Sequence, residues 1–544
     1  MTAHAQYPIK SQTRIANVSA APCSAEQGDD HPLPQVHAEK PRSSRQIYGL
    51  GCSSSSQDHV AIADDHIHGD CEIRTDPQLY ISLGHELVRE ARMGEAEACF
   101  RMAISLDPGD AMAYNNLGWV LQQKNDTAGA FVSYQRALEL QPELALVKRN
   151  VANLLARSGE ITKAVALWRA MAADFPQDRD LLTEAIESCL KAHDLDSAAY
   201  FAARNAALVR GSTILDLGAF AIRAPAKLQA ETFLTQAKLQ HDLQQIEYLA
   251  AKDERSDELA AHEAALRTAE ARYHAGQYAG RIALTDVPVA ERPPLFNRIA
   301  VYKPAPRVAG AALGAQWDRA LAHQEFQRHP LGVVVIDDFL SEAALDGLRT
   351  FCLDSTIWFA NRYAHGRLGA FFREGFNCPL LMQIASELRT ALPQVIRPEF
   401  PLEQLWAFKY APRQPATSPH ADFAAVNVNF WITPTEANME PESGGMLISD
   451  VEAPTDWSFD DYNRSGNRIA SYLASMDARW VNIPYRANRA VMFNSDLFHA
   501  TAPLHFRPGY ENRRINVTML YGNRRSDAHG ARRCAQADIS VNYL

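Results

Sequence analysis

Residues 108–142 of the chain are PGDAMAYNNLGWVLQQKNDTAGAFVSYQRALELQP, one copy of a pattern that recurs before and after it. Pro108, Pro142 and Pro176, which close successive copies, are 34 residues apart. Proline ends a helix because it lacks a backbone N–H, and small residues let two helices approach closely. The recurring positions are small (Gly84, Gly118, Ala152; Ala96, Ala130, Ala164) or aromatic (Phe100, Tyr134, Trp168).

This 34-residue pattern resembles the tetratricopeptide repeat, in which each unit is a pair of antiparallel helices and the units stack into a solenoid. The resemblance implies three repeats. Residues 179–210 keep Ala198 but have lost the closing proline, which indicates a degenerate or capping fourth unit. We therefore expect an α-solenoid over residues 75–210.

Asn116 and Asn150 occupy equivalent positions in two repeats. In the family this position lies on the concave face, and an asparagine amide can both donate to and accept from a peptide backbone. The resemblance therefore predicts that Asn116 and Asn150 bind a peptide. The alternative is that they are ordinary surface asparagines.

Composition describes the rest of the chain. Residues 1–74 are rich in polar residues and proline, so we expect a disordered tail. Several metal-ligating residues of this tail match no standard zinc spacing, which favours a solvated segment over a metal site: Cys52, His59, His66, His68 and Cys71. Residues 211–325 read as a helical connector with one long helix or a helical hairpin at 226–275, and residues 525–544 as a C-terminal tail.

The overall charge and apolar content exclude some classes of function. The net charge of −10 gives no reason to expect nucleic-acid binding. No apolar run approaches the roughly 20 residues that cross a bilayer, and the N-terminus lacks a secretory signal pattern. Eight cysteines without a CxxC pair favour reduced thiols and a cytoplasmic location. The oligomeric state stays open.

Residues 326–524 change to strand-like patterns. Ser341 is placed to cap a helix that runs to about Phe351. Short β-type runs with Pro and Gly between them are typical of a sandwich or jelly roll. They lie at 333–336, 405–410, 425–433, 445–448, 490–493 and 515–521. The segment between Gly445 and Trp480 is long and aromatic, and we expect it to form a loop or lid.

Chemistry is concentrated around Pro419-His420-Ala421-Asp422. On a strand, residues two apart share a face, so His420 and Asp422 would lie side by side. His499 is the candidate third member of a two-His, one-carboxylate triad, with His505 as its rival. Such a triad leaves open positions on iron(II).

Downstream, Arg514-Ile515-Asn516-Val517-Thr518 alternates so that Arg514 and Thr518 share a face and Arg513 points away. A guanidinium and a hydroxyl so placed can hold a carboxylate. Asn427 and Asn429 alternate with valines, and they either face the pocket or serve as structural hydrogen-bonders.

Residues 331–522 resemble an Fe(II)/2-oxoglutarate-dependent oxygenase of the prolyl 4-hydroxylase-like type. The resemblance rests on the His420–Asp422–His499 order, on Tyr410-Ala411-Pro412 before His420, and on Ser443-Gly444-Gly445 between Asp422 and His499. It implies a double-stranded β-helix (jelly roll) with flanking helices, and hence an α + β multidomain chain. It also implies that the triad is catalytic and binds iron, and that Arg514, Thr518 and Tyr410 bind 2-oxoglutarate.

The expected protein is a dioxygenase that hydroxylates a side chain of a protein or peptide recruited by the repeats. Fe(II) and the co-substrate 2-oxoglutarate are the expected cofactors, with ascorbate as a candidate accessory. The presence of Asp422 favours hydroxylation over halogenation. Two alternatives remain: an oxygenase acting on a small molecule or carrier-bound intermediate, and a catalytically silent repeat scaffold.

Overall fold

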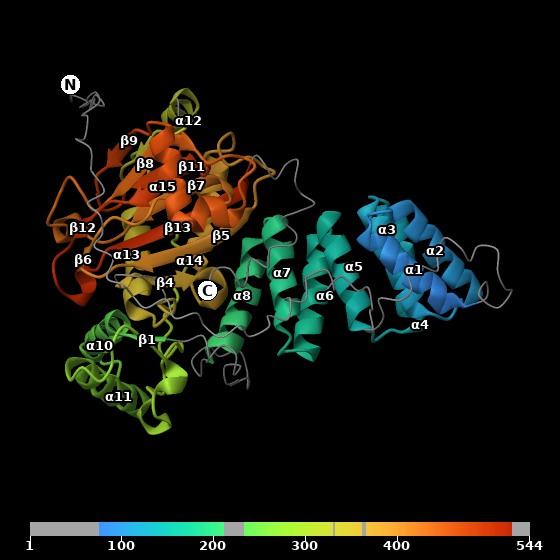
Figure 1. Ribbon diagram of the computed structural model, residues 1–544, viewed down its shortest axis with the longest axis horizontal. Coiled ribbons are helices and arrows are strands. Elements are labelled where there is room, and N and C mark those ends of the chain that lie inside the picture. Colours follow the sequence, from blue (N-terminus) through green and yellow to red (C-terminus); the bar gives the residue numbers. More distant parts are fainter. Residues whose placement is uncertain (1–75, 212–232, 330–331, 362–365, 525–544) are drawn as a thin grey trace. The chain divides into compact units, whose positions relative to one another are not determined.

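The computed structural model describes residues 76–211, 233–329, 332–361 and 366–524, all within one compact unit, Ser44–Leu544 (Figure 1). The two predicted tails, with the cysteines and histidines weighed as a metal site, lie outside the described residues. Among the helices that are described, none is both long and apolar enough to cross a bilayer. The cysteines within the described part are free thiols.

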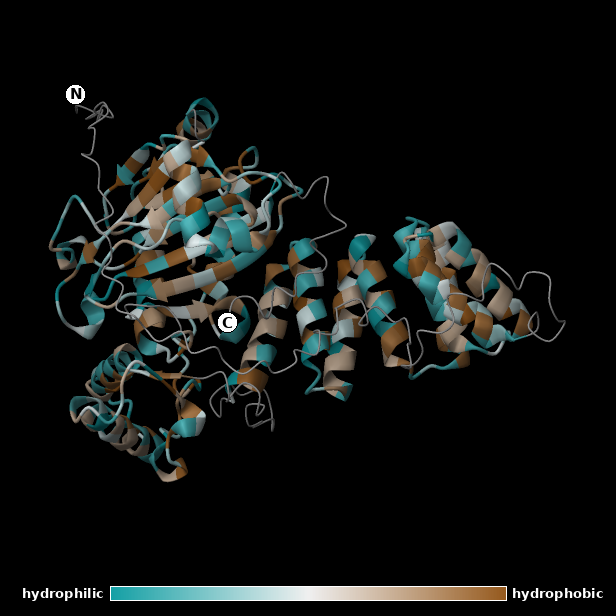
Figure 2. Ribbon diagram, viewed as in Figure 1, coloured by the Kyte–Doolittle hydropathy of each residue, from teal (hydrophilic) through white to brown (hydrophobic). Residues whose placement is uncertain are grey.

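Residues 76–211 form helices that pack in consecutive pairs, as the 34-residue register predicts. In Figure 2 the ribbons of these helices carry both brown, hydrophobic and teal, hydrophilic stretches, as amphipathic helices do. Aspartate side chains cap many of these helices, for example Asp110 and Asp178. The helices are α1 (Pro77–Arg89), α2 (Met93–Leu106), α3 (Ala111–Gln123), α4 (Thr127–Leu140), α5 (Ala145–Arg157), α6 (Ile161–Asp174), α7 (Arg179–Lys191) and α8 (Leu195–Arg210).

The glycines of the repeats allow the paired helices to touch. A Cβ atom placed on Gly118 would lie 2.7 Å from the ring of Tyr134, and one on Gly84 would lie 2.7 Å from the ring of Phe100. Both rings are fully buried. The small residue on one helix and the aromatic residue on the next are therefore one complementary contact, repeated along the solenoid.

This contact makes a testable prediction. We expect Gly118→Ala to destabilise the repeats by about 1–3 kcal/mol, because the added methyl group overpacks against Tyr134. The measurement is the thermal transition followed by helical circular dichroism, with hydrogen exchange to localise the effect to α3 and α4. A Cβ atom placed on Gly94 in α2 would have open space around it, so Gly94→Ala is the matched control and should be neutral or slightly stabilising. Equal effects of both changes would contradict the prediction.

The asparagines predicted to bind peptide are buried between repeats instead. Asn116 is 1% exposed and Asn150 is 3% exposed. The Asn116 amide contacts His85 Nε2 at 3.0 Å, and Asn150 Nδ2 donates to Asn115 Oδ1 at 2.8 Å. The surface alternative is wrong, and the peptide assignment is corrected: these amides join neighbouring repeats, because a buried amide must find its partners within the protein.

The connector forms a helical hairpin rather than one long helix. Helices α10 (Gln236–Ala250) and α11 (Asp257–His274) pack on each other. Asp253 between them has a φ of +62°, a left-handed conformation that ends the first helix. Residues 226–232 of the predicted segment lie outside the described part. The remaining elements are β1 (Phe233–Thr235), β2 (Arg281–Ala283) and α12 (Arg319–Arg328).

Residues 332–524 are rich in antiparallel sheet. A six-stranded sheet has the order β3 (Val334–Ile336), β10 (Ala490–Asn494), β7 (Ala424–Trp431), β13 (Ile515–Asn523), β5 (Leu402–Lys409), β4 (Leu368–Phe371). A three-stranded sheet has the order β11 (Leu497–Thr501), β8 (Met446–Glu452), β9 (Trp480–Ile483), and β12 (Leu504–His505) pairs with β6 (Arg413–Gln414). The six predicted β-type runs all fall on strands, whereas β4, β6, β9, β11 and β12 were not predicted.

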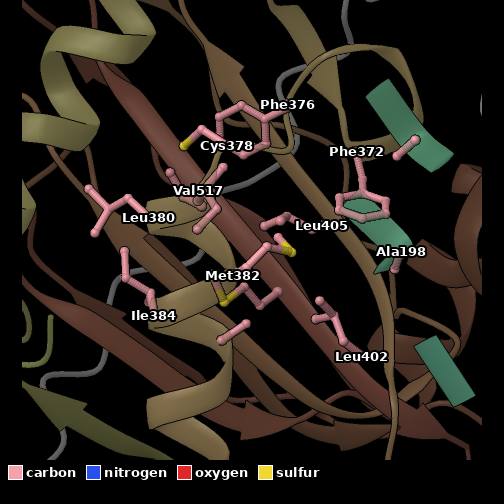
Figure 3. Packing of buried hydrophobic residues seen from close by; sticks show 14 of the residues in the cluster. Ala198, Phe372, Phe376, Cys378, Leu380, Met382, Ile384, Leu402, Leu405 and Val517 are labelled. Carbon is pink, nitrogen blue, oxygen red and sulfur yellow. The ribbon is translucent and has the colours of Figure 1, made fainter. Parts of the chain in front are cut away.

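The two faces of the six-stranded sheet bury different layers. On one face, strand residues such as Leu405 and Val517 pack against Leu380 and Met382 of helix α14 (Pro379–Ala391) (Figure 3). Helix α13 (Glu342–Asp354) belongs to the same layer and begins at the predicted Ser341 cap, whose Oγ accepts from the Ala344 backbone N–H. The opposite face joins the three-stranded sheet in a second cluster that includes Trp431, Ile448 and Phe493. Figure 3 shows only the first of these layers.

The last repeat helix packs directly on the sheet-rich part. Phe372, just after β4, lies beside Ala198 of α8 (Figure 3). Asn205 Nδ2 donates to the Arg373 carbonyl at 2.8 Å, and Arg210 forms an ion pair with Glu374. Contacts from α8 therefore end on the turn that follows β4.

Candidate metal centre

Two histidines from distant segments meet across a backbone bridge. The His420 N–H donates to the His499 carbonyl at 3.0 Å, and the His499 N–H donates back at 2.9 Å. His499 lies on strand β11, whereas His420 lies in an extended segment before β7 and not on a regular strand as predicted. The bridge places the two imidazole rings 4.5 Å apart between centroids.

Each imidazole is oriented by a backbone carbonyl. His420 Nδ1 lies 3.1 Å from the Ser418 carbonyl oxygen, and His499 Nδ1 lies 3.0 Å from that of Leu497. A carbonyl accepts only from a protonated nitrogen, so both contacts place the proton on Nδ1 and leave the Nε2 lone pair free. Metal-bound histidines in proteins are oriented in this way.

Asp422 completes the group. The ligand atoms of His420, Asp422 and His499 all lie within 4.8 Å of one another, and His499 Nε2 is 3.4 Å from Asp422 Oδ2. Two donors at right angles on one ion, each about 2.1 Å from it, are about 3 Å apart. The three ligand atoms would therefore fit around one divalent ion if they moved slightly closer together. Two histidines with one carboxylate are a ligand set that suits Fe(II).

The charge states also suit a metal. Burial, together with the neighbouring His499, lowers the pKa of His420 to about 4, so its imidazole is neutral near pH 7. Burial would raise the pKa of Asp422, but the neighbouring histidines and the hydrogen bond from the Asn427 amide outweigh burial, and the pKa lies below its ordinary value. The site thus offers a neutral imidazole and an ionised carboxylate.

A chain of amides supports Asp422 from behind. Asn427 Nδ2 donates to Asp422 Oδ2 at 2.6 Å, and Asn429 Nδ2 donates to Asn427 Oδ1. Asn516 Nδ2 and Thr518 Oγ1 donate in turn to Asn429 Oδ1, at 2.9 Å and 2.6 Å. Every donor points toward the carboxylate, so the chain polarises in one direction and stabilises negative charge on Asp422. Asn427 and Asn429 therefore face the site, and they also act as structural hydrogen-bonding residues within it.

A buried arginine lies deeper on the same sheet face. Arg514 is 1% exposed, its Nε donates to the Gly444 carbonyl at 2.7 Å, and its Cζ lies 4.7 Å from the centroid of the Tyr410 ring. Its Nη1 is buried with no hydrogen-bond partner among the described residues. Arg513 points to the other face, as predicted, where its Nε donates to Gln244. An unsatisfied buried guanidinium nitrogen is costly, and a bound carboxylate would satisfy it.

Tyr410 belongs to this region, and Thr518 only partly does. The Tyr410 hydroxyl contacts Thr501 Oγ1 at 3.3 Å. Burial would raise the pKa of Tyr410, but the positive charges of Arg367 and Arg514 hold it below its ordinary value. The Thr518 hydroxyl donates its hydrogen to Asn429 Oδ1. The predicted hydrogen bond from Thr518 to a co-substrate would therefore require the hydroxyl to rotate and to break this bond.

Sequence reasoning missed Arg367. It precedes the short strand β4, and a lone arginine there carries no local signal. Leu368 pairs with Lys409, so Arg367 lies across from Tyr410. Only the strand pairing brings it to the site.

The long segment after β8 covers the outer side of the metal group. It contains a π-helical turn at Asp460–Arg464 and helix α15 (Gly466–Ser475). Its aromatic residues pack with Ala421 and Phe498, which neighbour the ligands. The predicted loop or lid is thus a partly helical segment, and its Tyr462 carbonyl accepts from the Ala421 N–H at 2.9 Å.

The ligand choice can be tested with a matched histidine. His505, the rival candidate, contacts Glu440 at 3.2 Å and is not part of the group. We expect His499→Ala to weaken binding of Co(II), used as a spectroscopic probe for Fe(II), by more than about tenfold, because one of three ligands is lost. His505→Ala should bind Co(II) like the unmodified protein. Calorimetric titration measures both, and the reverse order of effects would reassign the third ligand.

The amide chain can be tested separately from the ligands. We expect Asn427→Ala to lower Co(II) affinity by about 10–100-fold, as loss of an outer hydrogen bond to a ligand does. The exposed Asn482, whose Nδ2 donates to the Glu442 carbonyl, provides the control Asn482→Ala. If Asn427→Ala kept full affinity, the chain would be only structural.

Comparison with known proteins identifies the repeats. Tetratricopeptide-repeat family models match residues 77–110 and 99–131. The chain is 29% identical over 124 residues to mouse protein O-mannosyl-transferase TMTC1, and this match covers 22% of this chain and 13% of the mouse protein. It is 30% identical over 79 residues to the peroxisomal targeting signal receptor of Kluyveromyces lactis, 14% of each chain. The N-terminal part is therefore built of tetratricopeptide repeats, and the chain spans only about an eighth of these relatives.

Two solved structures resemble part of the chain. A prolyl-4-hydroxylase of Pseudomonas putida is 15% identical with a TM-score of 0.26, covering 38% of this chain and all of that one. The α-ketoglutarate-dependent epimerase SnoN of nogalamycin biosynthesis is 13% identical with a TM-score of 0.29, covering 38% of this chain and 87% of that one. At these TM-scores neither structure establishes the fold of the sheet-rich part.

Proposed function

We propose that this protein is an Fe(II)- and 2-oxoglutarate-dependent dioxygenase that hydroxylates a side chain of a protein or peptide. The observation that carries the proposal is the pairing of two features that the chain of amides connects, because Asn427 donates to Asp422 and Asn516 lies two residues from Arg514. One is the His420–Asp422–His499 group, with both imidazoles oriented for a metal. The other is Arg514, whose buried Nη1 lacks a partner among the described residues.

The strand order supports a double-stranded β-helix around this site. The six-stranded and three-stranded sheets share the cluster that contains Tyr410, Trp431 and Ile448. His499 lies on the smaller sheet, and Arg514 immediately precedes β13 of the larger one. The space between the sheets therefore has metal ligands at one end and the guanidinium inside.

Different residues would bind the metal and the co-substrate. His420, Asp422 and His499 would hold Fe(II), and Arg514 would bind the distal carboxylate of 2-oxoglutarate as a bidentate partner. Tyr410 packs against the guanidinium and fixes its plane. When bound, iron would use dioxygen and 2-oxoglutarate for the oxidation: one oxygen atom of dioxygen would go to the co-substrate, which becomes succinate and carbon dioxide, and the other would convert a substrate C–H bond to C–OH.

The surrounding residues keep the site preorganised. The bridge between residues 420 and 499 fixes the imidazoles, and the amide chain keeps Asp422 ionised and oriented. The aromatic cluster over Ala421 and Phe498 limits access of water. Open positions on the ion remain for the co-substrate and dioxygen.

Tetratricopeptide repeats generally mediate contacts between proteins, and for this reason we favour a polypeptide substrate. Because Asn116 and Asn150 are buried, recruitment would use other residues of the repeats. A cytoplasmic location and a requirement for ascorbate belong to the same proposal.

The activity is tested by conversion of 2-oxoglutarate to succinate with Fe(II) and ascorbate in the presence of cell extract. We expect Arg514→Leu to raise the Kd for 2-oxoglutarate by about 100-fold, because a buried charged hydrogen bond contributes about 1.5–3 kcal/mol. The exposed Arg507 provides the control Arg507→Gln. Turnover is followed by mass spectrometry of succinate and of +oxygen modifications in the extract proteins. Tight metal binding without any turnover would favour the silent scaffold.

A further inference from the structure

A tryptophan of the six-stranded sheet has an indole N–H that no described residue accepts. Trp431 is the last residue of β7, its side chain is fully buried, and its Nε1 has no hydrogen-bond partner among the described residues. An indole N–H can only donate, and buried indoles usually find a partner because an unpaired buried donor costs free energy. The indole of Trp431 is therefore available to an acceptor that enters the interior.

The strand register places this indole close to Arg514. Trp431 pairs with Asn516 of β13, and Arg514 lies two residues before Asn516. The Arg514 Cζ lies 5.5 Å from the centroid of the Trp431 ring. Two hydrogen bonds of about 2.9 Å each span such a separation. One acceptor group can therefore contact the guanidinium and the indole together.

The guanidinium of Arg514 has one edge already occupied. Its Nε donates to the Gly444 carbonyl at 2.7 Å, and its Nη2 contacts the Gly445 carbonyl at 3.5 Å. Nη1, which lacks a partner among the described residues, lies at the other end of this planar group. Burial lowers the pKa of Arg514, and the groups that oppose this effect are the phenols of Tyr410 and Tyr485 rather than a carboxylate. The open end therefore suits an anion.

The hydroxyl groups around Arg514 are already engaged. The Tyr485 hydroxyl donates to a backbone carbonyl, the Thr518 hydroxyl donates to an asparagine of the amide chain, and the Tyr410 hydroxyl contacts a threonine hydroxyl. A carboxylate has about four lone-pair sites, so Nη1 alone does not satisfy it. Among these side chains, Trp431 supplies the second open donor.

The ring of Trp431 is held in place by Tyr485. The two ring centroids are 5.3 Å apart and the planes are inclined by 31°. The Tyr485 hydroxyl donates to the carbonyl of Thr433, two residues after Trp431, so the two rings and the strand are fixed to one another. The indole N–H thus keeps its direction before any ligand binds, which lowers the entropy cost of binding.

From these contacts we propose that Trp431 is a second anchor for the co-substrate. Its indole N–H donates to the distal carboxylate of 2-oxoglutarate, which Arg514 Nη1 binds at the same time. The two donors make the site selective for a keto acid with a distal carboxylate over one without it. This inference rests on the proposed dioxygenase function, and it names a residue that sets the co-substrate specificity.

The test compares two keto acids of equal length: 2-oxoglutarate, and 2-oxovalerate, which lacks the distal carboxylate. Calorimetry on the full chain loaded with Mn(II) under argon measures each Kd without turnover. We expect Trp431→Phe, which keeps an aromatic ring but removes the N–H, to raise the Kd of 2-oxoglutarate about tenfold, as loss of a hydrogen bond to a charged group does. The Kd values of 2-oxovalerate and Mn(II) should stay unchanged.

Trp168 provides the matched control. It is equally buried, and its Nε1 also lacks a partner among the described residues, but it lies on α6 in the repeats. Trp168→Phe removes the same atoms and should leave every Kd unchanged.

A second measurement uses the unmodified protein and so does not depend on the folding of a variant. The chain carries isotope-labelled tryptophan, and diamagnetic Zn(II) replaces Mn(II). We expect 2-oxoglutarate to move one of the eight indole N–H resonances downfield, as a new hydrogen bond to a carboxylate does, and 2-oxovalerate to leave it in place. The resonance is assigned to Trp431 by its absence from the spectrum of Trp431→Phe.

Three outcomes would overturn the inference. An unchanged Kd of 2-oxoglutarate in Trp431→Phe would indicate that the indole binds a water, for which the unpartnered Asn516 Oδ1 is a suitable second contact. Equal rises for both keto acids would show that Trp431 only shapes the pocket. In the unmodified protein, the contrary result is that no indole resonance responds to 2-oxoglutarate.

The same titrations separate this inference from the proposed function. If the unmodified protein with Mn(II) does not bind 2-oxoglutarate, the dioxygenase proposal fails, and the role of Trp431 fails with it. If 2-oxoglutarate binds and Trp431→Phe binds it equally well, only the present inference fails.

Discussion

One backbone bridge, between His420 and His499, sets the geometry on which the site depends. Two backbone hydrogen bonds hold together segments that are far apart in the sequence, and they bring both imidazole rings to 4.5 Å between centroids. The Asp422 N–H donates to the Ser495 carbonyl at 3.1 Å, a further main-chain contact between the same two stretches of the chain. Three ligands from two segments are thereby positioned by main-chain contacts, so their geometry does not depend on long flexible side chains.

The polar interior behind this bridge is stable only as a connected set. Buried amides cost free energy unless each has a partner, and a fully paired chain is stiffer than its separate members. Here the pairing begins at Asp422 and ends at Asn516, whose Oδ1 lacks a partner among the described residues. Two of the unsatisfied groups, Asn516 Oδ1 and Arg514 Nη1, belong to residues two apart in the sequence, one on β13 and one directly before it. Hydrogen-bonding atoms near the metal group thus lack partners among the described residues, whereas Asn427 and Asn429 are paired within the chain of amides.

The sequence predicted those features that depend on periodicity. The 34-residue register predicted the repeat helices, and alternation along one strand predicted that Arg514 and Arg513 point to opposite faces. Features that depend on pairing between distant segments were missed. His420 is held by a bridge and not by its own strand, and Arg367 reaches the site only because β4 pairs with β5. Asn116 looked accessible because its partner in the preceding repeat, His85, carries no pattern of its own.

The last repeat helices pack on one edge of the six-stranded sheet. Helix α8 contacts the turn Phe372–Glu374, which directly follows Phe371 on strand β4. Glu187 of α7 also pairs with Arg373, at 3.0 Å. Strand β4 is the edge of the six-stranded sheet, so the last repeat helix contacts the turn that follows an edge strand. Movement of α8 would therefore be transmitted first to β4.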